Sequence, residues 1–166
     1  MEIIKDVDPI FETEKYDVIM IGTSTHNMLT NGFQNKIRNK YPVVEEENNK
    51  TKYGDKGKLG TVKIVDCIQP VVALMYVYGY PNSNKCYLSY ESLDKCLGIC
   101  SGLFKGKKIM STLIGSSKYD GNGDKDVIMK MFEKHFKDED LTLYTCKQYR
   151  RVDELNHRCS QIWMKY

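Results

Sequence analysis

Short apolar runs alternate with segments of helical periodicity along most of this sequence, and this alternation restricts the chain to few folds. Residues 17–22 and 71–77 are nearly continuous in apolar residues, many of them β-branched. Runs of this kind are typical of strands buried on both faces of a parallel sheet. Helices that connect parallel strands cover both faces. The sequence therefore predicts an α/β fold of three layers, α/β/α, with a mixed, mostly parallel central sheet.

The same patterns predict the other elements. Further strands are expected at residues 3–7, 61–65, 108–114 and 140–145, and helices at 33–41, 43–50, 89–104, 124–136 and 148–166. Pro42 is expected to end the first helix, and Ser89 and Asp124 to cap later ones. In the helix after Asp124, the residues expected to face inward are Val127, Met131 and Phe132.

Composition narrows the classes of function. The chain has 166 residues and a net charge of +3, which fits one domain and is too small to indicate nucleic-acid binding. Its six cysteines form no metal-binding pattern, so no metal is expected. We expect no other cofactor. The start of the chain lacks the shape of a signal peptide, and no apolar run approaches the ~20 residues of a membrane span. We therefore expect a soluble cytoplasmic protein, in the host cytoplasm if the source is a phage or another virus.

Two long polar loops each follow a predicted strand and precede a predicted helix, at residues 22–32 and 115–123. Ligands of such folds bind beyond the carboxyl ends of the strands. Glycines let backbone N–H groups approach a ligand, and the N-terminus of the following helix favours anions. The pair is thus a candidate for holding a diphosphate. The alternative is plain connecting loops, because neither carries a known nucleotide-binding motif.

Three residues in these loops suggest chemistry beyond phosphate binding. Tyr119 is suited to stacking on a ribose or base, and Asp120 to acting as a general base or holding a water. His26 is able to titrate near neutral pH. The alternatives are that Asp120 only forms a turn with the following glycine and that His26 is an exposed loop residue. The lysine-rich stretch at 50–58 is most simply a solvated loop.

These loops resemble those of the macrodomain family. The first match is a buried strand followed by a loop that ends Thr30-Asn31-Gly32 and a helix that ends before Pro42. The resemblance continues at Tyr90-Glu91, at residues 109–120 and at residues 141–144, so it spans about residues 2–145. It is greatest to a small branch that contains phage macrodomain proteins, ADP-ribose-1″-phosphate phosphatases and hydrolases that remove ADP-ribose from acidic side chains.

The resemblance implies a macrodomain-like domain at residues 1–146 with a helical extension at 147–166 packed on it. It also implies binding of ADP-ribose, of a derivative or of ADP-ribosylated protein. Asp120 would then act on water, with His26 or Asn27 at the distal ribose or leaving group. The implied ligand-binding residues are Asp6 or Asp8 near the adenine, Asn31, Gly32 and Phe33 in the first loop, and Gly115, Ser116, Ser117, Lys118 and Tyr119 in the second.

The sequence also departs from the family pattern. The usual run of three glycines is reduced to Gly32, and Ser116-Ser117 replace residues that are commonly glycine. The family's first-motif asparagine corresponds to Asn27 only with altered spacing. Two hypotheses therefore remain: a hydrolase acting on ADP-ribose derivatives, and a non-catalytic reader or sequestering protein. A third is an interaction protein that uses the terminal helix. The leaving group and the oligomeric state stay open.

Overall fold

A computed structural model describes residues 1–30, 32–80, 84–118 and 120–145. Its strands form a six-stranded sheet of order β1-β6-β5-β2-β4-β3. The strands are β1 Glu2–Lys5, β2 Val18–Ser24, β3 Val62–Asp66, β4 Val71–Tyr78, β5 Ile109–Thr112 and β6 Leu141–Thr145. The pairing of β3 with β4 is antiparallel and every other pairing is parallel. The expected mixed, mostly parallel sheet is confirmed.

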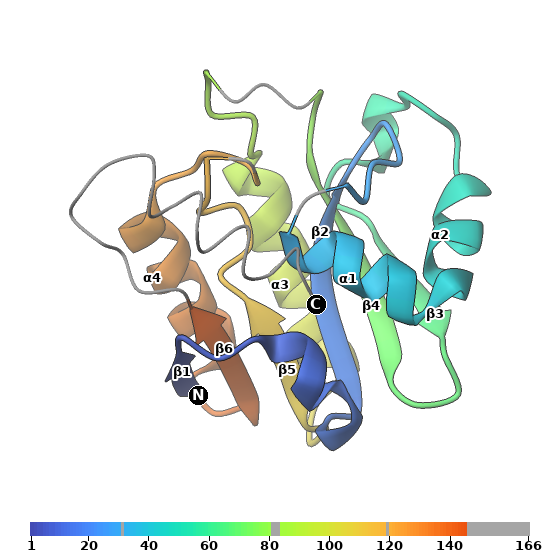
Figure 1. Ribbon diagram of the computed structural model, residues 1–166. Coiled ribbons are helices and arrows are strands. Elements are labelled where there is room, and N and C mark those ends of the chain that lie inside the picture. Colours follow the sequence, from blue (N-terminus) through green and yellow to red (C-terminus); the bar gives the residue numbers. More distant parts are fainter. Residues whose placement is uncertain (31, 81–83, 119, 146–166) are drawn as a thin grey trace.

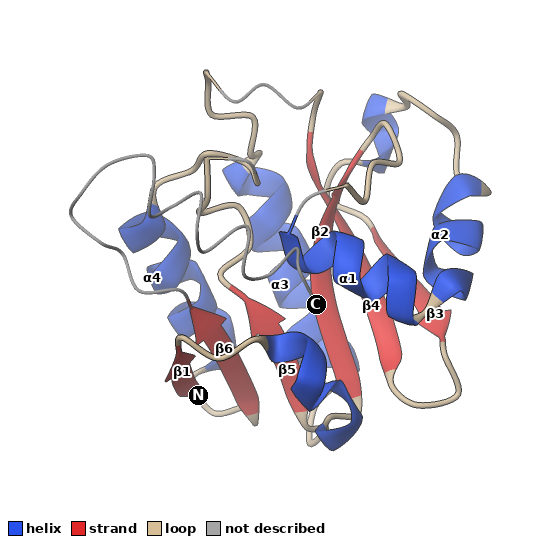
Figure 2. Ribbon diagram, viewed as in Figure 1, coloured by secondary structure: helices blue, strands red, loops and turns tan. Residues whose placement is uncertain are grey.

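Helices cover both faces of this sheet, as Figures 1 and 2 show. The helices are α1 Gly32–Lys40, α2 Pro42–Asn49, α3 Tyr90–Leu103 and α4 Lys125–Phe136, with 3₁₀ helices η1 Pro9–Lys15 and η2 Lys56–Lys58. In Figure 1, η1, α1 and α2 lie in front of the sheet, and α3 and α4 lie behind it. Pro42 does end α1, and it also occupies the first turn of α2, where its missing N–H costs nothing.

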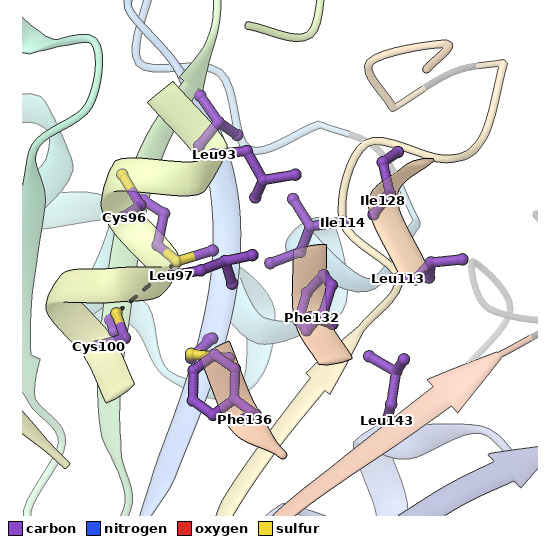
Figure 3. Packing of buried hydrophobic residues seen from close by; sticks show 14 of the residues in the cluster. Leu93, Cys96, Leu97, Cys100, Leu113, Ile114, Ile128, Phe132, Phe136 and Leu143 are labelled. Atoms are coloured by element: carbon purple, nitrogen blue, oxygen red, sulfur yellow. Dashed lines mark hydrogen bonds between the residues drawn. The ribbon is translucent and has the colours of Figure 1, made fainter. Parts of the chain in front are cut away.

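Strand β2 shows why two apolar layers form. All seven of its residues are buried, and successive side chains point to opposite faces of the sheet. Met20 belongs to the cluster under α3 and α4, whereas Ile19 and Ile21 belong to the cluster under η1 and α1. Figure 3 shows the first cluster, in which leucine, isoleucine and phenylalanine side chains interdigitate between helices and sheet. Burial of each such side chain contributes about 1.5–3 kcal/mol.

Two helix caps are confirmed and one inward residue was predicted wrongly. Ser89 Oγ accepts a hydrogen bond from the Ser92 N–H at 3.2 Å, and Asp124 Oδ1 accepts from the Val127 N–H at 3.1 Å. However, the Val127 side chain is 45% exposed, while Ile128 is fully buried. One helical position corresponds to a rotation of about 100°, so choosing the neighbouring residue places the apolar stripe on the wrong side.

The expected helix at 148–166 and the expected division of the chain at residue 146 lie outside the described residues. Within the described ranges, no helix is both long and apolar enough to cross a membrane. Nor do three or more histidine, cysteine, aspartate or glutamate residues gather there in a way that would hold a metal ion.

A contact between α3 and α4 makes stability depend on pH. Asp94 Oδ1 lies 2.8 Å from His135 Nε2 and 3.1 Å from Lys134 Nζ. The hydrogen bond with His135 first, and that with Lys134 second, lower the pKa of Asp94. We expect this contact to stabilise the fold fully above about pH 4, the unfolded aspartate pKa. The contribution is lost as the pH falls through the lower, folded pKa.

Urea unfolding of the wild type and of Asp94→Asn, measured between about pH 2 and pH 6, checks this expectation. The two free energies of unfolding should converge at the acid end and separate as the pH rises. Asp138→Asn is the control, because Asp138 is an exposed aspartate just beyond α4. A difference between wild type and Asp94→Asn that stays constant across the range would contradict the assignment.

Candidate functional site

The two polar loops leave the sheet at the same edge. Parallel strands β2, β4 and β5 are neighbours and end at Ser24, Tyr78 and Thr112. The loop that follows β2 leads into α1, and the loop that follows β5 leads into α4, with both on the upper side of Figure 1. This is the edge at which ligands of parallel α/β sheets bind. Because β2 and β5 are neighbours in the sheet, the loops that follow them emerge side by side.

A hydrogen bond joins the two sides directly. Gln34 Nε2, in the first turn of α1, donates to Asp120 Oδ1 at 2.9 Å. The Gly115 N–H donates to Asp120 Oδ2 at a longer 3.4 Å. Asp120 therefore lies between the second loop and the N-terminal turn of α1, whose dipole favours negative charge. The loops that the sequence pattern paired are adjacent in the structure.

The second loop is held closed by its own backbone. Gly115 O accepts from the Gly123 N–H at 2.7 Å, and Ser117 O accepts from the Asp120 and Asn122 N–H groups at 3.0 and 2.8 Å. Gly121 has a φ of +85°, so Asp120 and Gly121 also form the turn that was the alternative reading. Within this turn the Asp120 carboxylate still reaches Gln34 of α1.

Five predicted ligand-binding residues belong to this loop. Ser117 and Lys118 are exposed, and Ser116 Oγ donates to Leu113 O at 2.7 Å. Gly115 is buried with a φ of +85°, and a Cβ there would lie 2.7 Å from a methyl group of Leu88. Only glycine fits this position without strain and displacement of Leu88. Tyr119 lies outside the described residues.

The surroundings of Asp120 control its charge. Although part of the residue is exposed, its carboxylate is enclosed by protein, and this burial raises its pKa. The nearby Tyr78 hydroxyl, the Gly115 N–H and the Gln34 amide act in the opposite direction. The net effect is a pKa above the ordinary aspartate range, as is common for carboxylates that transfer protons.

Tyr78 and Gln34 were not among the predicted site residues. Tyr78 ends β4 and is 3% exposed, so in the sequence it is indistinguishable from a core aromatic residue. Gln34 lies in the first turn of α1 and is 8% exposed. A buried glutamine requires hydrogen-bond partners. Its partner is 86 positions away in sequence, so no local pattern identifies the contact.

His26 and Asn27 lie on the loop after β2. The His26 ring is edge-on to Tyr53 and to Tyr80, with ring centroids 5.1 Å apart in both cases. Asn27 has a φ of +56°, and its side-chain Nδ2 donates to Thr51 O at 3.1 Å. Among the hydrogen bonds of the described residues, none joins either side chain to Asp120.

The prediction that residues 50–58 form a solvated loop is wrong for Lys58. Its side chain is 9% exposed, and its ammonium lies 5.0 Å from the centre of the Tyr76 ring. It donates hydrogen bonds to Asn27 Oδ1 and, at 3.0 Å, to Thr51 Oγ1. Burial lowers the pKa of this ammonium. Lys58 therefore anchors the loop after β2 from below through Asn27.

Two further residues predicted to bind the ligand, Gly32 and Phe33, differ in their surroundings. Gly32 begins α1 with a φ of +45°, and Phe33 is 4% exposed within the apolar cluster under α1. A ligand at this turn would therefore meet the backbone of Phe33, because its ring is part of the core. Asn31 lies outside the described residues.

Asp6 and Asp8 differ in their surroundings. Asp8 forms an ion pair with Lys36 of α1, and both side chains are nearly buried. Asp8 Oδ1 also caps η1 by accepting from the Ile10 N–H at 3.1 Å. Asp6 is exposed, and its N–H donates to Thr145 O at 3.0 Å, which places it at the carboxyl ends of β1 and β6. Of these two aspartates, Asp6 is the one that is exposed at this edge of the sheet.

This chain forms a three-layer α/β domain with a mixed sheet, helices on both faces and two adjacent loops at one edge. The domain has the macrodomain fold. A protein of unknown function from Bacteroides thetaiotaomicron matches with a TM-score of 0.71 and 19% identity over 87% of this chain and 98% of its own. The macrodomain of Mycobacterium tuberculosis DarG matches with a TM-score of 0.65 and 12% identity, covering 86% of this chain and 96% of its own.

Thermosipho africanus DarTG, solved in complex with ADP-ribose, matches with a TM-score of 0.66 and 10% identity over 99% of this chain and 46% of its own. No protein-family model and no curated protein sequence gives a significant match. At these identities the similarity establishes the fold, and the chemistry has to be argued from the site itself.

Proposed function

We propose that this chain binds ADP-ribose or a derivative between the loop after β2 and the loop after β5. The observation that carries the proposal is the Gln34–Asp120 hydrogen bond, which places the N-terminal turn of α1 against the second loop. The diphosphate would lie along backbone N–H groups near Gly32 and Gly115, where the N-terminus of α1 favours an anion. The ADP-ribose complex of the similar DarTG structure supports the choice of ligand.

The positions of Asp6 and Asp120 along this edge of the sheet suggest how ADP-ribose would be oriented. Asp6 would lie at the adenine, because Asp8 is engaged by Lys36 and by η1. The distal ribose would then lie at Asp120, with Tyr119, which is not described, also assigned to that end. His26 and Asn27 would contact the leaving group from the loop after β2, where Lys58 holds Asn27 in place. Exposed Ser117 and Lys118 would lie beside the phosphates.

We further propose that the bound derivative is hydrolysed at the distal ribose, with phosphate or a protein side chain released. Asp120 would accept a proton from the attacking water, whose oxygen forms the new bond as the bond to the leaving group breaks. A raised pKa suits a carboxylate that must both accept and return this proton. The second candidate is a non-catalytic ADP-ribose reader, which is favoured by the protein donors already present on both Asp120 oxygens.

Calorimetric titration with ADP-ribose tests binding. Lys118→Glu is expected to weaken binding by at least about tenfold, because a hydrogen bond to a charged group contributes about 1.5–3 kcal/mol. Lys107→Glu makes the same change of charge at an exposed position before β5, on the opposite edge of the sheet. That control should bind like the wild type. Equal weakening by both variants would indicate a general effect of net charge, and absence of binding by the wild type would reject the proposed function.

A further inference from the structure

The Tyr78 hydroxyl lacks a hydrogen-bond partner of normal geometry among the residues that the structure describes. Its side chain is 3% exposed, so bulk water does not supply the partner. Buried polar groups in native proteins are almost always hydrogen-bonded, and exceptions need a specific explanation. The mechanism proposed above makes no use of this hydroxyl.

The hydroxyl lies at the base of the proposed site. A Cβ on Gly22 would be 2.7 Å from Tyr78 Oη, and a Cβ on Gly121 would be 2.8 Å from Cε1 of the ring. Glycines on β2 and on the second loop thus leave the space that the tyrosine ring occupies. The Asp120 carboxylate and the Gly115 N–H both lie close enough to affect the pKa of Tyr78. The phenol therefore lies beside the group assigned to catalysis, at the border of the apolar cluster to which its ring belongs.

Asp120 has room for one more donor. Gln34 occupies Oδ1 at 2.9 Å, whereas the Gly115 N–H reaches Oδ2 only at 3.4 Å. A good N–H···O hydrogen bond is shorter, and each carboxylate oxygen can accept two hydrogen bonds. A tyrosine hydroxyl is a suitable donor for this second oxygen.

We propose that Tyr78 is a positioning residue for Asp120. Its hydroxyl faces the Asp120 carboxylate in the free protein and donates a hydrogen bond of normal geometry once an ADP-ribose derivative is bound, while Gln34 holds the other oxygen. Together the two donors direct the carboxylate toward the distal ribose. This inference rests on the proposed function and adds a residue that acts through Asp120 and does not touch the substrate.

Loss of the Tyr78 hydroxyl should change the pH profile of activity. Hydrogen bonds donated to a carboxylate favour its ionised form, so loss of the Tyr78 hydroxyl should raise the pKa of Asp120 further. The acid limb of activity then moves to higher pH. Tyr87, half buried and edge-on to Tyr78, also faces Asp120, and Lys118 is the cation of the same loop. Tyrosine and lysine side chains do not change charge in the acid range.

Tyr78→Phe is the test variant, and Tyr144→Phe is its matched control. Tyr144 is equally buried, but its hydroxyl lies 2.8 Å from that of Tyr16. Removal of a partnerless hydroxyl should leave Tm unchanged or raised, whereas removal of a hydrogen-bonded one should lower it. Tyr78→Phe should also lower kcat by about tenfold or more, the effect of one lost hydrogen bond to a charged group, with KM little changed.

The deciding measurement is the titration of the Asp120 carboxyl carbon by ¹³C NMR, with and without ADP-ribose, with Asp120→Asn identifying the signal. Tyr78→Phe should move the titration to higher pH, and Tyr144→Phe should not. An unchanged titration in Tyr78→Phe overturns the inference even if ADP-ribose binds. A shift in a protein that fails to bind ADP-ribose supports Tyr78 as a positioning residue and rejects the proposed function alone.

Discussion

Asp120→Asn is expected to lower kcat for hydrolysis of an ADP-ribose derivative by about 10²–10⁴-fold, the usual contribution of a positioned general base. The amide is close in size to the carboxylate, and its oxygen can still accept the hydrogen bond from Gln34 Nε2. The two loops should therefore stay together. Affinity for ADP-ribose, which depends on the backbone of both loops, should remain within a few-fold of the wild type.

The measurement is turnover of ADP-ribose-1″-phosphate and of an ADP-ribosylated protein, with ADP-ribose affinity determined in parallel. Asp126→Asn is the control, because Asp126 is an exposed residue in the first turn of α4. It should retain full activity. Equal turnover by the wild type and Asp120→Asn would remove Asp120 from the mechanism. A wild type that binds ADP-ribose but converts neither substrate would favour the non-catalytic reader.

The fold was predictable because the signals that specify it are local. Apolar runs such as residues 17–22 identify strands buried on both faces, and Ser89 and Asp124 identify helix starts by their capping side chains. The alternation of these elements then leads to a mostly parallel sheet. Val127 was assigned inward where Ile128 is buried, because a helical stripe is wide enough to accept either neighbour in the sequence.

The candidate site was predictable only in part. Its edge follows from topology, since loops after parallel strands emerge on one side of the sheet. Its contacts do not, because Gln34 and Asp120 are far apart in sequence. The burial of Lys58 was missed for a related reason: a polar, glycine-containing stretch is typical of a solvated loop unless a partner such as Asn27 is known.

Gly121→Ala is expected to destabilise the fold by roughly 2–5 kcal/mol. About 1–2 kcal/mol arises because alanine is strained at a φ of +85°. A further ~1–3 kcal/mol arises because the new Cβ overpacks its surroundings. It would lie 2.8 Å from Gly115 Cα and 2.9 Å from Gly115 O. Those atoms belong to the backbone, so they cannot move aside as a flexible side chain would.

Gly106→Ala separates the two contributions. Gly106 has a φ of +76°, and a Cβ there would meet nothing within 4 Å. Its cost should therefore be about 1–2 kcal/mol, from the backbone alone. Urea unfolding of the two variants gives the difference directly, since both replace a glycine in the left-handed region by the same residue. Equal destabilisation would mean that the second loop relaxes around the methyl group.

The ADP-ribose affinity of the same two variants tests whether the second loop must keep its shape for ligand binding. Gly121 lies next to Asp120, and its carbonyl accepts hydrogen bonds from the N–H groups of Tyr87 and Leu88 at 2.9 and 3.1 Å. A loop displaced by Gly121→Ala would move Asp120 away from Gln34, so ADP-ribose affinity should fall even where the variant is fully folded. Gly106→Ala, at the other edge of the sheet, should lose stability without losing affinity. If both keep full affinity, the closed form of the second loop is needed for folding and not for ligand binding.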